Sequence, residues 1–143
     1  QVEPGPRNAY LFSFQMSPKR SNSRSSWKGF AYVTARAGNL PEAPVAILTR
    51  TPGLDKMLGN RREAGTEAFQ RQFTVTCPQE GAAEAVINAG VERCLLDHAS
   101  GREWNLAVAI SRTAVLVRSR WAETEQEWDY LASLGTRLRD AVR

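Results

Sequence analysis

The sequence is poor in the residues that most often build metal sites and nucleophilic active sites. Its 143 residues include one histidine and two cysteines. A structural zinc site takes four Cys or His ligands, so this composition comes close to excluding one. The phosphate-binding, dinucleotide-binding, serine-nucleophile and zinc-protease motifs are also missing from the sequence. We therefore expect no metal, no organic cofactor and no enzymatic activity.

Cys94 and His98 are the one pair that suggests a reactive site. They are four residues apart in a predicted helix and would share one helix face. A nucleophilic pair needs an orienting third group and a metal site needs further ligands, and the nearby sequence signals neither. We favour a buried cysteine followed by a polar residue at a fraying helix end. A small enzyme that uses Cys94 remains an alternative.

Long apolar runs are missing as well. No stretch approaches the roughly 20 apolar residues that a bilayer-spanning helix requires. The chain begins at Gln1 without methionine or a signal-peptide pattern, so we expect a fragment or a processed form. Cys77 and Cys94 would lie roughly 25 Å apart along a helix, too far for a disulfide, which favours a reducing compartment.

Positive charge is concentrated in the N-terminal part of the chain. Residues 1–62 contain ten cations and three acids, a net charge of +7, whereas residues 63–143 contain nine cations and twelve acids, a net charge of −3. Arginine supplies sixteen of the nineteen cations, and its planar fork suits carboxylate and phosphate groups. A basic surface on one side of the molecule would attract an anionic partner. The candidate contact residues for an anionic surface are Lys19, Arg20, Arg24, Lys28, Arg50, Lys56, Arg61 and Arg62.

The densest cluster of these cations lies in the serine-rich stretch 17–28. Three interpretations are open: a solvated loop, a contact with a membrane or an acidic partner, and a nucleic-acid contact. Nucleic-acid binders add exposed aromatic residues to such a stretch, but the neighbouring aromatics fall within predicted strands. We favour the solvated loop.

Hydrophobic periodicity predicts an α+β fold. Residues 1–8 read as a flexible lead-in or the end of a linker, and residues 9–143 as a single domain. The expected architecture is a curved antiparallel sheet of about six strands packed with two amphipathic helices, in the order β-β-β-β-α-β-β-α. The predicted strands are 10–16, 27–37, 45–50, 69–76, 104–110 and 114–120, and the predicted helices are 76–97 and 124–143.

Several short motifs resemble one family. They are Leu40-Pro-Glu-Ala-Pro-Val45 before a strand, Glu67-Ala-Phe-Gln-Arg-Gln-Phe-Thr-Val75, Leu95-Leu96-Asp97 at a helix end, and Trp104 on a hairpin. This pattern resembles actinobacterial membrane-associated proteins of unknown function, in which a soluble domain follows N-terminal transmembrane segments. The resemblance implies a membrane-tethered, non-enzymatic domain and supplies no catalytic residues.

The leading hypothesis joins these observations. We expect a non-catalytic interaction domain, the soluble and cytoplasmic part of a membrane-anchored protein, with a protein partner or an anionic membrane surface. The alternative is a nucleic-acid-binding module that uses the basic N-terminal half.

Overall fold

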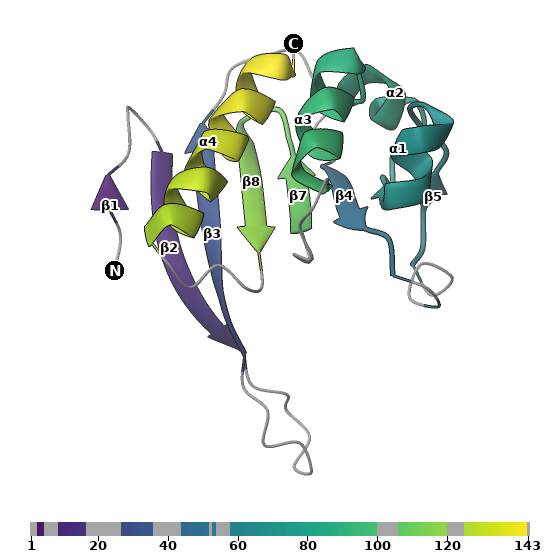
Figure 1. The fold of residues 1–143 in the computed structure, drawn as a ribbon. Helices are drawn as coiled ribbons and strands as arrows, with labels where there is room; N and C mark the ends of the chain where they lie inside the picture. The colour runs from purple at the N-terminus through teal and green to yellow at the C-terminus, as the bar shows by residue number, and fades with distance from the viewer. Residues whose placement is uncertain are drawn as a thin grey trace.

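An open antiparallel sheet forms the body of the molecule (Figure 1). The computed structural model describes residues 3–4, 9–16, 27–35, 44–51, 53, 58–99, 106–119 and 125–142. The spatial order of the strands is β1-β2-β3-β8-β7-β4-β6-β5, and every neighbouring pair is antiparallel. The strands are β1 (Glu3–Pro4), β2 (Ala9–Met16), β3 (Trp27–Ala35), β4 (Val45–Thr49), β5 (Arg61–Arg62), β6 (Phe73–Thr76), β7 (Leu106–Ile110) and β8 (Ala114–Ser119).

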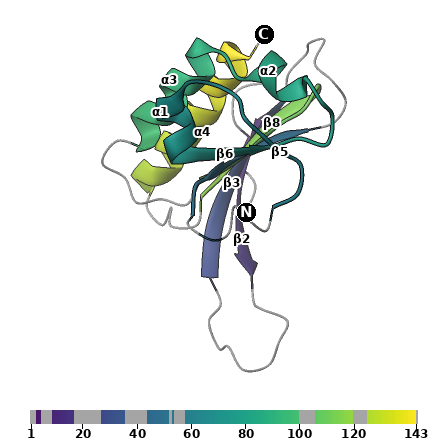
Figure 2. The ribbon, with the colours of Figure 1, turned by 90° about the vertical axis from the view of Figure 1, so that its right-hand side faces the viewer.

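Helices cover one face of this sheet (Figure 2). The longer two are α3 (Ala89–Ala99) and α4 (Glu125–Ala141), and the shorter two are α1 (Glu67–Gln72) and α2 (Ala82–Val86). The predicted α+β class and the antiparallel sheet are therefore confirmed. Five of the strands have five or more residues.

Two predicted hairpins form as expected. In the first, Met16 of β2 pairs with Trp27 of β3, and the loop that joins them lies outside the described residues. In the second, the β7–β8 turn is closed by Ser111, whose backbone N–H donates to the Ala114 carbonyl at 2.9 Å. The Ser111 hydroxyl also accepts from the Ala114 N–H at 3.1 Å. Alternating residues mark such hairpins because a strand places successive side chains on opposite faces.

The strand predicted over residues 69–76 is wrong in its first half. Residues 67–72 form α1, and only residues 73–76 form a strand. Thr66 caps the helix, since its side-chain oxygen accepts from the Phe69 N–H at 3.3 Å. Phe69 and Phe73 are both buried and stack with ring centroids 5.2 Å apart. A spacing of four residues fits one face of a helix as well as one face of a strand, so alternation alone misled the prediction.

The helix predicted over residues 76–97 is also corrected. It is two helices, α2 and α3, and the chain turns between Cys77 and Ala82 before the first begins. Asn88 separates them, because its Oδ1 accepts from the Val91 N–H at 3.0 Å and so caps α3. An asparagine side chain competes with the backbone for hydrogen bonds in this way, which favours a helix start over a helix interior.

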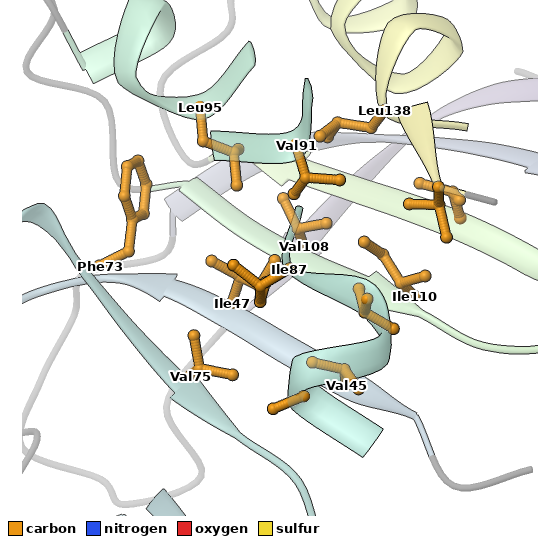
Figure 3. Close-up of a cluster of buried hydrophobic side chains, with 14 of the residues drawn as sticks. Val45, Ile47, Phe73, Val75, Ile87, Val91, Leu95, Val108, Ile110 and Leu138 are labelled. Carbon is orange, nitrogen blue, oxygen red and sulfur yellow. The ribbon is translucent and has the colours of Figure 1, made fainter. Parts of the chain in front are cut away.

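The hydrophobic core lies between the helices and the sheet (Figure 3). Val91 and Leu95 of α3 and Leu138 of α4 point toward the inner face of the strands. Each buried aliphatic side chain of this kind contributes about 1.5–3 kcal/mol relative to exposure. The strands supply Val45, Ile47, Phe73, Val75, Val108 and Ile110 to the same cluster.

Candidate functional site

A pocket of about 450 Å³ opens where β4 ends and β5, β6 and α1 meet. These elements lie at one end of the sheet in Figure 1. Backbone pairing assembles the site: the Arg50 N–H donates to the Gln72 carbonyl at 2.8 Å, and Arg61 and Arg62 of β5 pair with Thr76 and Val75 of β6. The lining residues are Arg50, Arg61, Arg62, Glu63, Ala64, Glu67, Gln70, Arg71, Phe73, Thr74 and Val75. We call this site the arginine pocket.

Three of the predicted contact residues meet here. Arg50, Arg61 and Arg62 all line the arginine pocket, although a stretch of ten residues separates Arg50 from Arg61 in the sequence. Lys28 lies in β3, paired with Gln15. The remaining candidates lie outside the described residues: Lys19, Arg20, Arg24 and Lys56.

The pocket carries excess positive charge. Four arginines and two glutamates line it, so the formal charge of the lining is +2. Arg71 forms an ion pair with Glu67 one turn earlier in α1, with both side chains largely exposed. Exposed pairs of this kind contribute about 0–1 kcal/mol, so an anionic ligand could compete for Arg71 at little cost.

Arg62 has a different environment from the exposed arginines. Its side chain is half-buried, and its Nε donates to the Cys77 carbonyl at 3.0 Å. Its Nη2 also lies 3.5 Å from the Pro78 carbonyl. These contacts hold the guanidinium against the carbonyls of Cys77 and Pro78, two residues that do not line the pocket. Arg62 therefore contributes a fixed side chain to the pocket lining, whereas Arg50 and Arg61 contribute exposed ones.

Sequence reasoning named three of the eleven lining residues and missed eight, among them Arg71 and Thr74. Arg71 falls in the strand predicted over residues 69–76, but it lies on α1 and lines the pocket. Thr74 is only 4% exposed, and its Oγ1 makes no hydrogen bond within the described part of the chain. The sequence does indicate on which face of the sheet Thr74 lies. It stands between Phe73 and Val75, whose side chains face the core, so its own side chain points to the opposite face of the sheet.

Aromatic stacking surface is scarce at this site. Among the described residues that line the pocket, Phe73 is the one aromatic, and it is 2% exposed and stacked on Phe69. A nucleic-acid base would need an exposed aromatic ring to stack on. The pocket therefore offers charge and hydrogen-bond donors rather than a stacking platform.

The prediction that His98 frays at the helix end is wrong, because its side chain is only 2% exposed. Cys94 is only partly buried, packed against the core. The Nδ1 of His98 lies 2.9 Å from the Tyr130 hydroxyl of α4, and the two rings stack. This contact joins α3 to α4, a packing role for the histidine. Within the described ranges, no cluster of three His, Cys, Asp or Glu side chains could hold a metal ion.

Removal of the Tyr130 hydroxyl tests this packing role. We expect Tyr130→Phe to lower the free energy of unfolding by about 1 kcal/mol, because a buried histidine loses a hydrogen bond while ring stacking is kept. Urea denaturation followed by circular dichroism measures the change. An unchanged free energy of unfolding would mean that the His98–Tyr130 bond contributes nothing to the α3–α4 contact.

The described helices include none that is long and apolar enough to cross a bilayer. Comparisons of the chain with protein families, with curated proteins and with solved structures gave no match. The resemblance to actinobacterial membrane-associated proteins, and the membrane attachment that it implies, therefore stay predictions.

Proposed function

We propose that this chain is a non-catalytic interaction domain that binds an anionic group of its partner in the arginine pocket. The convergence of Arg50, Arg61, Arg62 and Arg71 on one concavity carries this proposal. Arginine forks bind oxyanions through paired, charge-assisted hydrogen bonds, which are about twice as strong as neutral ones. Attachment to a membrane, with the domain on the cytoplasmic side, remains part of the proposal on the family resemblance alone.

A discrete anionic group fits this site better than an extended anionic surface. The four arginines line one pocket and are not arranged along an extended groove. A single anionic group bound in the pocket can therefore contact several of them. A bilayer surface or a nucleic-acid backbone would meet the exposed Arg50, Arg61 and Arg71 but not the half-buried Arg62. The buried position of Phe73 argues further against base stacking.

The proposal is tested with the double variant Arg50→Gln/Arg61→Gln. We expect a hexaglutamate peptide and inorganic phosphate to shift the backbone amide NMR signals of residues 61–76 in the unchanged protein. The variant should bind both probes about tenfold more weakly, because two charge-assisted contacts are lost. Both side chains are exposed, so the free energy of unfolding should change by less than about 0.5 kcal/mol.

A matched control separates the pocket from overall charge. Arg93→Gln/Arg137→Gln removes the same two charges from exposed positions on α3 and α4. This control should bind the probes as the unchanged protein does. A pocket-based function would be refuted if both double variants lost the same affinity for the probes. It would also be refuted if neither probe shifted the amide signals of the unchanged protein. Salt-sensitive binding of a single-stranded DNA 20-mer, weakened equally by both, would favour the nucleic-acid alternative.

A further inference from the structure

The face of the sheet opposite the helices is apolar along β4, β7 and β8. In each of these strands alternate residues enter the core, and the residues between them lie on the outer face. The outer residues of apolar type are all half-buried: Ala46, Leu48, Ala107, Ala109, Ala114 and Leu116. A sheet with one solvated face normally alternates apolar and polar residues, so these strands have the composition of a sheet that is covered on both faces.

Strand pairing extends this face through β3 and β2. Leu116 pairs with Val33, and Val33 pairs with Tyr10, so the three positions share one face. The described helices lie on the other side of the sheet (Figure 2). The same register adds alternate positions of both strands to the face: Tyr10, Phe12, Phe14 and Met16 of β2, and Trp27, Gly29, Ala31, Val33 and Ala35 of β3. We call the outer positions of β2, β3, β8, β7 and β4 the outer sheet face.

One charged residue belongs to the outer sheet face. Arg118 is exposed and pairs with Ala31 and Ala107. It is the penultimate residue of β8, where a long arginine side chain can place its charge at the rim of a contact while its stem covers apolar surface. The rest of the face is thus suited to an apolar partner.

We infer that the outer sheet face binds the same face of a second copy of this chain, so that the protein forms a homodimer. The inference goes beyond the proposed function and does not depend on the arginine pocket. Two sheets pack face to face about 10 Å apart, with their apolar side chains between them. A two-fold axis lets one patch serve both copies, which is the commonest symmetry of soluble oligomers.

Residue size changes across the outer sheet face in a way that suits this symmetry. Large residue types occupy β2, whereas β7 and β4 carry Ala107, Ala109 and Ala46. β8 lies two strands from β2 and two strands from β4. A two-fold axis parallel to the strands and close to β8 therefore brings β2 of one copy over β4 of the other. Large residues then face small ones, an arrangement that fills an apolar interface without voids.

The outer sheet face is large enough for a specific dimer. Strands lie about 4.8 Å apart and rise about 3.4 Å per residue, so these five strands of five to nine residues cover roughly 500 Å². Two copies together bury roughly 1,000 Å², which is the lower limit for a specific interface. We therefore expect a dimer with a micromolar dissociation constant, which dissociates on dilution.

Sedimentation velocity of the full chain tests this inference. We expect the apparent mass to rise from the 15.9 kDa of one chain toward twice that value between about 1 µM and about 200 µM protein. Ala109 pairs with Leu116 and Ala46 near the middle of the face. Ala109→Glu should raise the dimer dissociation constant at least about a hundredfold, because the symmetry places two unpaired carboxylates in the interface.

Ala85→Glu is the matched control, since Ala85 is exposed on α2, on the helix side of the sheet. This control should dimerise as the unchanged protein does, and circular dichroism checks that both variants fold. Dilution of the unchanged protein gives a second test that needs no variant. Its backbone amide NMR signals should shift more in residues 45–49, 106–110 and 114–119 than in residues 125–141.

A chain that stays monomeric at the highest concentration would overturn the inference. The same conclusion would follow if Ala109→Glu left the dimer intact, or if Ala109→Glu and Ala85→Glu weakened it equally. If a monomeric chain co-sedimented with phosphatidylcholine vesicles and Ala109→Glu abolished this binding, a lipid surface would cover the face in place of a second copy.

Discussion

Gly65→Ala should destabilise the protein by about 3–5 kcal/mol, a large share of the 5–15 kcal/mol typical of a folded domain. Gly65 has a φ of +83°, a left-handed conformation that costs other residues about 1–2 kcal/mol. A Cβ at this position would lie 2.6 Å from Oε1 of Glu92 and 2.9 Å from Cδ1 of the buried Phe69. Overpacking of this kind costs about 1–3 kcal/mol.

The same Glu92 oxygen accounts for part of this expected loss. It accepts from the backbone N–H of Thr66 at 2.5 Å and so ties the start of α1 to α3. A methyl group at position 65 would displace that carboxylate and break the hydrogen bond, which for a charged acceptor is worth about 1.5–3 kcal/mol. Urea unfolding followed by circular dichroism measures the free energy of unfolding directly.

Gly81→Ala is the matched control for this prediction. Gly81 has nearly the same φ, +81°, but a Cβ there would meet no atom within 4 Å. The control should lose only about 1–2 kcal/mol, the cost of the left-handed backbone alone. If both alanine variants lost the same free energy, the close contacts at Gly65 would be relieved without cost, contrary to the expectation.

Asn88→Ala should lower the free energy of unfolding by about 1.5–2.5 kcal/mol. One side chain serves two helices: Oδ1 caps the start of α3 through the Val91 N–H, and Nδ2 donates to the carbonyl of Ala141, the last residue of α4, at 2.8 Å. Loss of an N-cap costs about 1 kcal/mol. Loss of the second hydrogen bond adds about 0.5–1.5 kcal/mol, because the carbonyls at a helix end have no partner within the helix.

Asn88→Asp divides these two contributions. Aspartate keeps an acceptor for the Val91 N–H and is an equally good N-cap, but it cannot donate to the Ala141 carbonyl. Thermal and urea unfolding of the two variants should therefore place aspartate between alanine and asparagine. An aspartate variant as stable as the unchanged protein would show that the bond to Ala141 contributes nothing to stability.

Local sequence patterns predicted the secondary structure correctly where the apolar residues follow a single period. The alternation in residues 10–16 and 114–120 indicated β2 and β8, and the helix predicted over residues 124–143 corresponds to α4, whose buried residues are Leu131, Leu134, Gly135 and Leu138. Such patterns are readable because a two-residue or a 3.6-residue period follows from backbone geometry alone. They were ambiguous at Phe69 and Phe73, whose spacing fits both periods, and at Asn88, where a single side chain ends one helix and begins another.

The charge distribution was predictable, but the residues of the arginine pocket were not. An excess of cations in residues 1–62 is a property of composition, and it indicated an anionic partner. The pocket lining also includes Arg71 and Thr74, which belong to the acidic segment 63–143. The net charges of the two segments could not indicate that these residues lie in the same pocket as Arg50. Their proximity to Arg50 depends on β4 pairing with β6, a contact between segments more than twenty residues apart.

Composition and local patterns therefore specify the fold class, the two predicted hairpins, the last helix and the concentration of positive charge in residues 1–62. Each of these follows from interactions between residues close in the chain or from composition. The strand order, the break at Asn88 and the presence of four arginines in one pocket lining are set by the tertiary structure. These depend on which strands pair across long separations, and that choice is made by burial of the whole apolar face at once rather than by any local pattern.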